Sequence, residues 1–150
     1  MNTESERLIY GLHRQGQDKV TYFLLAAAGA SIAFGLSQTR ADTLAWPHVL
    51  LGLALIAWAW SILQGLRHIW QTDSILQGNM ELIRIQTGRH PDLGANPQNI
   101  AWGSGTLGEV LEKSSARSQR YARQQFAGLA VGAGFYICWH VLEMYLRGLA

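Results

Sequence analysis

The sequence predicts an all-α membrane protein with three transmembrane helices, the second and third of which extend into a cytoplasmic antiparallel helical hairpin. Three observations lead to this prediction. Apolar stretches of membrane-spanning length occupy 20–37, 46–70 and 124–146. Helical patterns continue directly from the second stretch and lead directly into the third. Lys and Arg gather in alternate connections, as is typical of multi-pass membrane proteins.

The composition agrees with a membrane protein of one domain. Charged residues make up 15% of the 150 residues, against about 25% in typical soluble domains. The net charge of +2 is too small to indicate a nucleic-acid partner. The single cysteine, Cys138, excludes a disulfide framework within the chain. The first nineteen residues are polar and no cleavage site follows a short apolar core, so we expect the first span to be a retained signal-anchor.

Residues 1–19 are expected to form a cytoplasmic amphipathic helix. Thr3 and Glu6 have the spacing of a capping box at its start. Two placements remain open, on the membrane surface or packed against the other cytoplasmic parts. Packing is favoured because the apolar face is too small for strong surface binding. That face contains Leu8, Ile9 and Leu12.

The first span, 20–37, carries no charge and is bracketed by Lys19 and Arg40. Its second half is rich in Ala and Gly, and Gly29 and Ala33 are candidate contact residues. Small residues favour association of membrane helices because they allow the backbones to approach closely. The partner helix belongs either to the same chain or to a second subunit.

The second span, 46–70, begins and ends with a tryptophan, Trp46 and Trp70. Tryptophan prefers the headgroup region of a bilayer. The stretch corresponds to about 36 Å of helix, enough for a hydrocarbon core of about 30 Å with its interfaces. The polar segment 38–45 before it is long enough only for a turn between antiparallel spans.

The segment 71–123 is predicted to form a cytoplasmic helical hairpin. Its tip is expected to be a loop over 88–105, which is rich in Gly and Pro. The second helix of the hairpin is expected to begin at Thr106, because Thr106 and Glu109 again have the spacing of a capping box. This helix then continues into the third span, 124–146.

The distribution of basic residues predicts the orientation in a bacterial-type inner membrane. Most Lys and Arg lie in the N-terminal segment and in 71–123, whereas the 38–45 turn has only Arg40 and the C-terminus only Arg147. The positive-inside rule therefore places the N-terminus and the hairpin in the cytoplasm and the C-terminus outside.

Two features of the third span are candidate oligomer or pore contacts. Gly128 and Gly132 form a GxxxG pattern, which favours close helix crossing. His140 and Glu143 are ionisable groups within the span, and such groups are often functional. Glu143 is expected either to form a local ion pair with Arg147 or to contribute, with His140, to a ring at the mouth of a pore. Together these features predict a homo-oligomer.

The tip loop is a candidate site for an anion or for a partner. The segment 103–106 is expected to offer free backbone N–H groups at a helix start, where anions bind. The side chains expected around it are Arg84, Arg89, His90, Ser104 and Thr106. The alternative is a flexible connector. Apolar residues of the same loop could instead dock a partner, namely Pro91, Leu93, Pro97, Ile100 and Trp102.

No enzyme activity is expected, because the chain contains no Ser/His/Asp grouping, metal-ligand spacing or pair of carboxylates. No cofactor is predicted by the leading interpretation. His48 and His140 lie toward the same side of the membrane, and two histidines on facing helices can ligate a haem. A haem b subunit is therefore the third hypothesis.

The first hypothesis is a small oligomeric channel or membrane-permeabilising effector, controlled through its hairpin by a cytoplasmic protein or a small-molecule signal. Three spans with a soluble helical hairpin loosely resemble the small helical membrane effectors of bacterial defence systems. The second hypothesis is a non-catalytic adaptor or accessory subunit of a larger membrane complex, which docks its partner at the hairpin tip.

Overall fold

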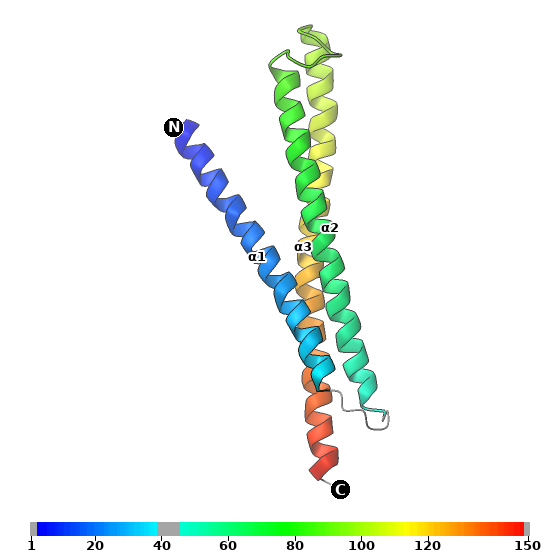
Figure 1. Ribbon diagram of the computed structural model, residues 1–150. Coiled ribbons are helices and arrows are strands. Elements are labelled where there is room, and N and C mark those ends of the chain that lie inside the picture. The colour runs from blue at the N-terminus through cyan, green and yellow to red at the C-terminus, as the bar shows by residue number, and fades with distance from the viewer. Residues whose placement is uncertain (1–2, 39–45, 149–150) are drawn as a thin grey trace. The chain divides into compact units, whose positions relative to one another are not determined.

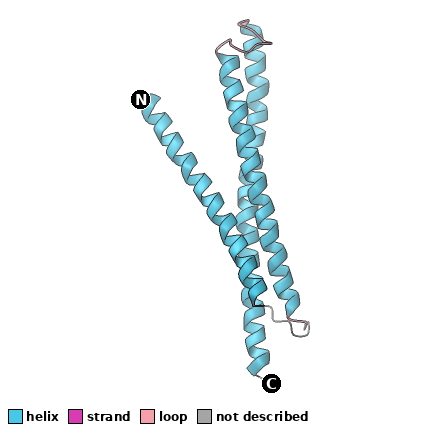
Figure 2. Ribbon diagram, viewed as in Figure 1, coloured by secondary structure: helices cyan, strands magenta, loops and turns pink. Residues whose placement is uncertain are grey.

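The computed structural model describes residues 3–38 and 46–148, and it contains three helices (Figure 1). These are α1 (Thr3–Ser37), α2 (His48–Gln86) and α3 (Pro97–Gly148). The described part of the chain contains helices, turns and loops but no strand, as Figure 2 shows. The all-α prediction is therefore confirmed.

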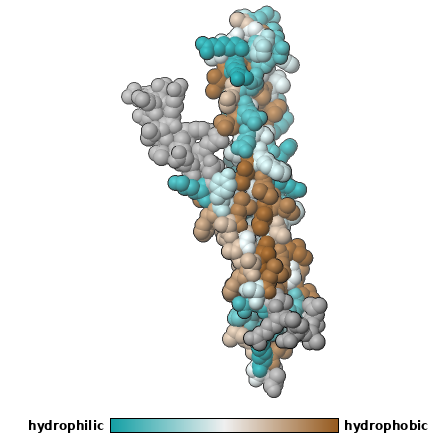
Figure 3. Space-filling view, in the orientation of Figure 1, coloured by the Kyte–Doolittle hydropathy of each residue, from teal (hydrophilic) through white to brown (hydrophobic). Residues whose placement is uncertain are grey.

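All three helices are long and apolar enough to cross a membrane, in α1 over the stretch Lys19–Ser37. The chain thus has the character of a multi-pass membrane protein. Figure 3 shows hydrophobic side chains gathered where α2 and α3 carry their uncharged stretches. Many large apolar side chains of the membrane-spanning stretches are exposed, for example Phe23 of α1 and Ile56 of α2 at 70% and 68%. Such exposure suits a surface in contact with lipid, where no water opposes it.

The predicted N-terminal helix and the first span form one uninterrupted helix, α1. Only the backbone is described for residues 3–15, 17 and 18. The predicted capping box of Thr3 and Glu6 and the predicted apolar face therefore lie outside the described side chains. Most of the predicted 38–45 turn also lies outside the described residues.

The chain divides into two compact units. Unit 1 comprises Met1–Gly65 and Ala122–Ala150, and unit 2 comprises Leu66–Tyr121. In each unit a part of α2 packs against a part of α3. The predicted helical continuation beyond Trp70 is confirmed, because α2 runs without a break to Gln86.

In unit 1, α2 and α3 run antiparallel, as their contacts show. Trp58 of α2 donates from Nε1 to the carbonyl of Leu129 at 3.3 Å, and Ser61 donates to the carbonyl of Gln125 at 2.7 Å. A later residue of α2 thus meets an earlier residue of α3. The buried apolar residues of this unit are Ala28, Leu51, Ala54, Trp58 and Trp139.

In unit 2 the same two helices also pack antiparallel. His68 contacts Ser118, and Leu111 covers Gly78. At the end of the hairpin, a Cβ atom on Gly103 would lie 3.4 Å from Cγ2 of Ile85, so glycine allows the helices to approach closely there. The predicted antiparallel hairpin is therefore confirmed for unit 2.

Helix α2 ends in a Schellman motif. Arg89 N–H donates to the carbonyl of Arg84 at 2.9 Å, and Gly88 N–H donates to the carbonyl of Ile85 at 3.0 Å. Gly88 has a φ of 67°, the left-handed conformation that this motif requires and that glycine adopts without a steric penalty. The end predicted near residue 87 is thus confirmed, with a specific cap.

The prediction of a loop over 88–105 is wrong in its second half, because α3 begins at Pro97. Asn96 is the N-cap: its Oδ1 accepts from the N–H of Gln98 at 3.0 Å, and its carbonyl accepts from Ile100 at 3.0 Å. Pro97 occupies the first helical position, where its missing N–H costs nothing. Of the residues that predicted a loop here, Pro97 begins the helix, Gly103 lies at a close helix contact and Gly105 is an exposed position inside the helix.

Candidate functional site

A layer of buried polar residues joins the three helices of unit 1. Gln125 of α3 donates from its side-chain Nε2 to the backbone carbonyl of Thr21 of α1 at 3.3 Å. The backbone carbonyl of Gln125 accepts from the hydroxyl of Ser61 of α2. Gln125 is 1% exposed and Ser61 is fully buried. Interhelical hydrogen bonds of this kind fix the register of membrane helices. Sequence reasoning missed this layer, although glutamine inside apolar stretches was a usable signal.

Gln64 belongs to the same buried region but differs from its neighbours. It is 0% exposed, and neither its Oε1 nor its Nε2 has a hydrogen-bond partner among the described residues. A buried amide without partners costs about 1–3 kcal/mol. Gln64 is therefore expected to lower the stability of unit 1, whereas Gln125 and Ser61 raise it through their hydrogen bonds.

The GxxxG glycines of the third span are used inside the chain. A Cβ atom on Gly128 would lie 3.1 Å from the carbonyl oxygen of Ala57 and 3.2 Å from Cα of Ser61. Gly132 lies against the indole of Trp58. The close crossing that GxxxG predicted thus occurs between α2 and α3 of one chain, and both glycines are buried there.

Gly29 and Ala33 lie differently. No atom lies within 4 Å of the position of a Cβ atom on Gly29, so this position is open. Ala33 is exposed, as are Ala26 and Ala30. This face of α1 is therefore uncovered by the described part of the chain.

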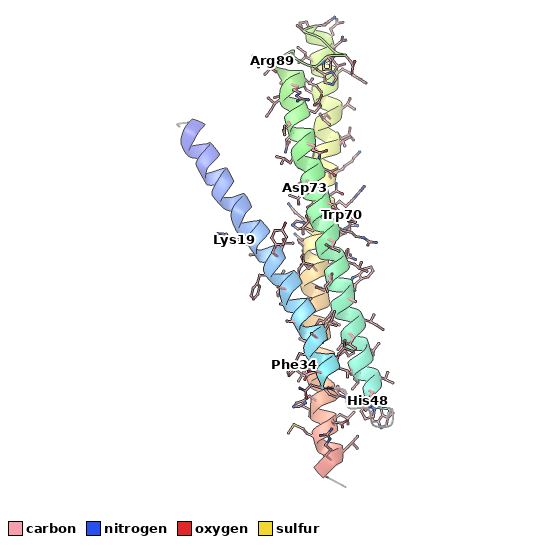
Figure 4. The ribbon with its side chains drawn as sticks, viewed as in Figure 1. Lys19, Phe34, His48, Trp70, Asp73 and Arg89 are labelled. Carbon is pink, nitrogen blue, oxygen red and sulfur yellow. The ribbon has the colours of Figure 1, made fainter. Side chains whose placement is uncertain are left out.

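An aromatic cluster surrounds Tyr136 of α3. The ring of His140 stacks on that of Tyr136 with 6.2 Å between centroids and 7° between planes. Phe34 of α1 and Trp58 of α2 lie 6.0 and 5.9 Å from the same ring. Figure 4 labels Phe34 near the end of α1. The cluster thus connects all three helices of unit 1.

The two histidines of the haem hypothesis both lie near Trp139. The ring of His48, labelled at the start of α2 in Figure 4, is 6.3 Å from that of Trp139, and the ring of His140 is 6.2 Å from it and also stacks on Tyr136. No group of three or more metal-ligating side chains occurs in the part of the chain that the structure describes. The geometry adds no argument for haem.

Glu143 forms the predicted local ion pair. Arg147 donates to its Oε1 from Nε at 3.1 Å and from Nη2 at 2.9 Å. The two residues are one helical turn apart near the end of α3. This interaction accounts for both charges within one subunit.

At the hairpin tip, His90 organises the loop between α2 and α3. Its Nδ1 accepts hydrogen bonds from the backbone N–H groups of Asp92 and Leu93 at 3.2 and 3.3 Å. Its Nε2 lies 3.1 Å from Oε1 of Glu81, whose other oxygen accepts from Arg84. These contacts fix the tautomer with the proton on Nε2, so that His90 donates to Glu81.

The anion site predicted at the tip lacks its expected helix start. Residues 103–106 lie inside α3, where backbone N–H groups bond within the helix. Ser104 has its hydroxyl buried without a described partner, and Thr106 is exposed. Glu109 does not cap Thr106 but pairs with Lys113. Arg89, labelled in Figure 4, is exposed in the loop.

The apolar residues proposed for partner docking at the tip separate into two groups. Leu93 and Ile100 are half-buried, and Leu93 lies against Gly103. Trp102 is 69% exposed, and Pro91 and Pro97 are also exposed. Further exposed apolar side chains lie along the helices of unit 2; they are Trp70, Leu76, Met80, Ile83 and Val110.

The comparisons with known proteins add no family. No protein-family model matches the chain, and no curated protein or solved structure matches it. The functional argument therefore depends on the geometry of the two units.

Proposed function

We propose that this protein is a non-catalytic docking subunit of a membrane complex, held by its three spans, with unit 2 as the part that binds a partner protein. The observation that carries the proposal is a row of exposed apolar side chains on α2. Leu76, Met80 and Ile83 are 38%, 53% and 59% exposed. We call these three residues the α2 ridge.

The spacing of the α2 ridge is that of a helix-recognition surface. Positions i, i+4 and i+7 lie along one side of a helix, and this is the pattern by which an amphipathic helix enters an apolar groove. Unit 2 also carries charges, including Asp73 on α2 and Glu112 on α3, which are exposed. Charged residues keep a helix pair out of hydrocarbon. An apolar row among charges outside the lipid favours a protein partner.

The proposed orientation follows the positive-inside rule, with the hairpin in the cytoplasm of a bacterial-type cell and the C-terminus outside. It is tested by single cysteines placed at Ser115 and at Gly148, in a chain with Cys138→Ser. We expect a membrane-impermeant thiol reagent added to intact cells to label position 148 only. Labelling at position 115 under the same conditions would contradict the orientation.

Docking is tested by a photo-reactive residue placed at Met80 of the full-length protein in its native cells. The matched control carries the same residue at Ser115, an exposed polar position of unit 2. We expect one discrete cross-linked protein from position 80, absent from position 115 and lost when Ile83→Glu is added. Equal cross-linking from the two positions would contradict the proposal. A cross-link between two copies would instead make the α2 ridge a self-association surface.

A second candidate function, an oligomeric pore, is favoured by the open face of α1. Gly29 has no atom within 4 Å of a Cβ position, and Ala26, Ala30 and Ala33 are exposed. Such a face suits close packing of α1 against a second copy. Ion flux into liposomes that contain this protein alone, abolished by Gly29→Leu, would support the pore. Absence of flux from correctly folded protein would exclude it and leave the docking subunit.

A further inference from the structure

A groove of about 450 Å³ runs between α2 and α3 in unit 1. On α2 it is lined by Leu53, Ile56 and Trp60, and on α3 by Ala127, Val131 and Phe135. The polar residue in its lining is Gln124, at one end. None of the described residues that line the groove belongs to α1, so α1 does not fill it.

The length of the groove matches one leaflet of a bilayer. From Gln124 to Phe135 the lining of α3 extends about 16 Å along the helix axis. Half of a typical hydrocarbon core is about 15 Å. An acyl chain occupies one leaflet, so its length matches that of the groove.

A basic residue outside the lining adjoins the polar end of the groove along α3. Arg123 precedes Gln124, is exposed, and forms no ion pair within the described part of the chain. The sequence has no acidic residue between Glu112 and Glu143. A guanidinium at the boundary of a span can bind a phosphate through two parallel N–H donors.

We propose that this groove binds one acyl chain of an anionic phospholipid and that Arg123, with Gln124 beside it, binds the phosphate of the same lipid. The inference requires that α2 and α3 cross a membrane, and it is independent of whether unit 2 docks a partner or the protein forms a pore. A bound lipid would seal the open side of the α2–α3 contact and fix the depth of Arg123 at the headgroup region.

The test measures lipid binding to the delipidated full-length protein in detergent by native mass spectrometry. The probes are phosphatidylglycerol and phosphatidylcholine with identical acyl chains. Arg123→Gln removes the charge, and Arg117→Gln is its matched control on the same helix. Ala127→Phe fills the groove, and Ala130→Phe is its control, since Ala130 is exposed and does not line the groove.

We expect the unaltered protein to bind phosphatidylglycerol more tightly than phosphatidylcholine. Arg123→Gln should weaken phosphatidylglycerol binding about tenfold, as expected for one charge-assisted interaction. It should weaken phosphatidylcholine binding less, because the choline cation already offsets the charge of that lipid's phosphate. Ala127→Phe should abolish binding of both lipids, and the two controls should bind as the unaltered protein does. Soluble glycerol phosphate should not compete, because it lacks the chain.

Three results would overturn the inference. Arg123→Gln and Arg117→Gln could have equal affinities for phosphatidylglycerol. Glycerol phosphate could compete fully, which would leave a simple anion site. Ala127→Phe could change the mass of the oligomer and leave lipid occupancy intact, which would make the groove a contact between subunits. If Ala127→Phe does not fold, as judged by circular dichroism, the comparison of the two arginine variants decides.

Discussion

The indole ring of Trp58 on α2 lies against Gly132 on α3, where it occupies the space that a side chain at position 132 would fill. The indole N–H then reaches the carbonyl of Leu129 at 3.3 Å. Trp58 is 3% exposed, and its ring also lies near Gly35 of α1 and 5.9 Å from the ring of Tyr136. Gly132, which the sequence predicted as an oligomer contact, thus allows α2 and α3 of one chain to pack closely.

A larger residue at Gly132 should therefore destabilise unit 1. Gly132→Leu must displace Trp58, and overpacking of this kind costs about 1–3 kcal/mol. We expect a clear fall in the melting temperature of the protein in detergent, followed by tryptophan fluorescence. Gly134→Leu is the control, because no atom lies within 4 Å of a Cβ at Gly134. Equal melting temperatures for the two variants would refute the intrachain role of Gly132.

The polar layer predicts opposite effects for two glutamines of similar burial. Gln64→Leu should raise the melting temperature, because it removes a buried amide whose atoms have no described partner. Gln125→Leu should lower it, because the hydrogen bond to Thr21 is lost. Each change is on the order of 1 kcal/mol. A decrease for Gln64→Leu would show that Gln64 has a partner in the assembled protein.

The start of α3 at Pro97 predicts the effect of an alanine at Gly105. This position is exposed and has no atom within 4 Å of a Cβ. Alanine is favoured over glycine inside a helix by about 1 kcal/mol, so Gly105→Ala should stabilise unit 2 against urea. The opposite change is expected for Gly88→Ala, because Gly88 has a φ of 67°. Two variants of equal stability would contradict the helix boundaries.

The contacts of His90 predict local loosening when its ring is removed. His90→Ala leaves the N–H groups of Asp92 and Leu93 without their acceptor. We expect faster hydrogen exchange at residues 91–94 and no change in unit 1. Arg89→Ala serves as the control at an exposed neighbouring position. Unchanged exchange at 91–94 in the His90 variant would show that the loop does not depend on the imidazole.

Much of the fold could be predicted because its signals are local. Apolar length, tryptophans at span ends and helical patterning are properties of short stretches, and they indicated three helices and an antiparallel hairpin before any contact was known. The ion pair of Glu143 and Arg147 was predictable for the same reason, since residues one turn apart on a helix meet whatever surrounds them.

The tip loop shows where local signals fail. Gly103 and Gly105 indicated a loop, yet they lie inside α3. A Cβ at Gly103 would be 2.8 Å from Cδ1 of Leu93, so a larger residue would have to displace a neighbour that only the folded hairpin supplies. Pro97 had the same ambiguity, because proline ends one helix and begins another equally well.

The sequence by itself determined that this chain forms long helices with membrane-spanning stretches, since lipid and backbone hydrogen bonding leave few other choices for such stretches. Only the tertiary structure decided which small residues face a partner helix. Gly132 is covered by Trp58 of the same chain, whereas Gly29 is open. The sequence does not distinguish the two positions, because a glycine permits close approach of a neighbouring helix from any side. The side that is used depends on how neighbouring helices rotate and cross.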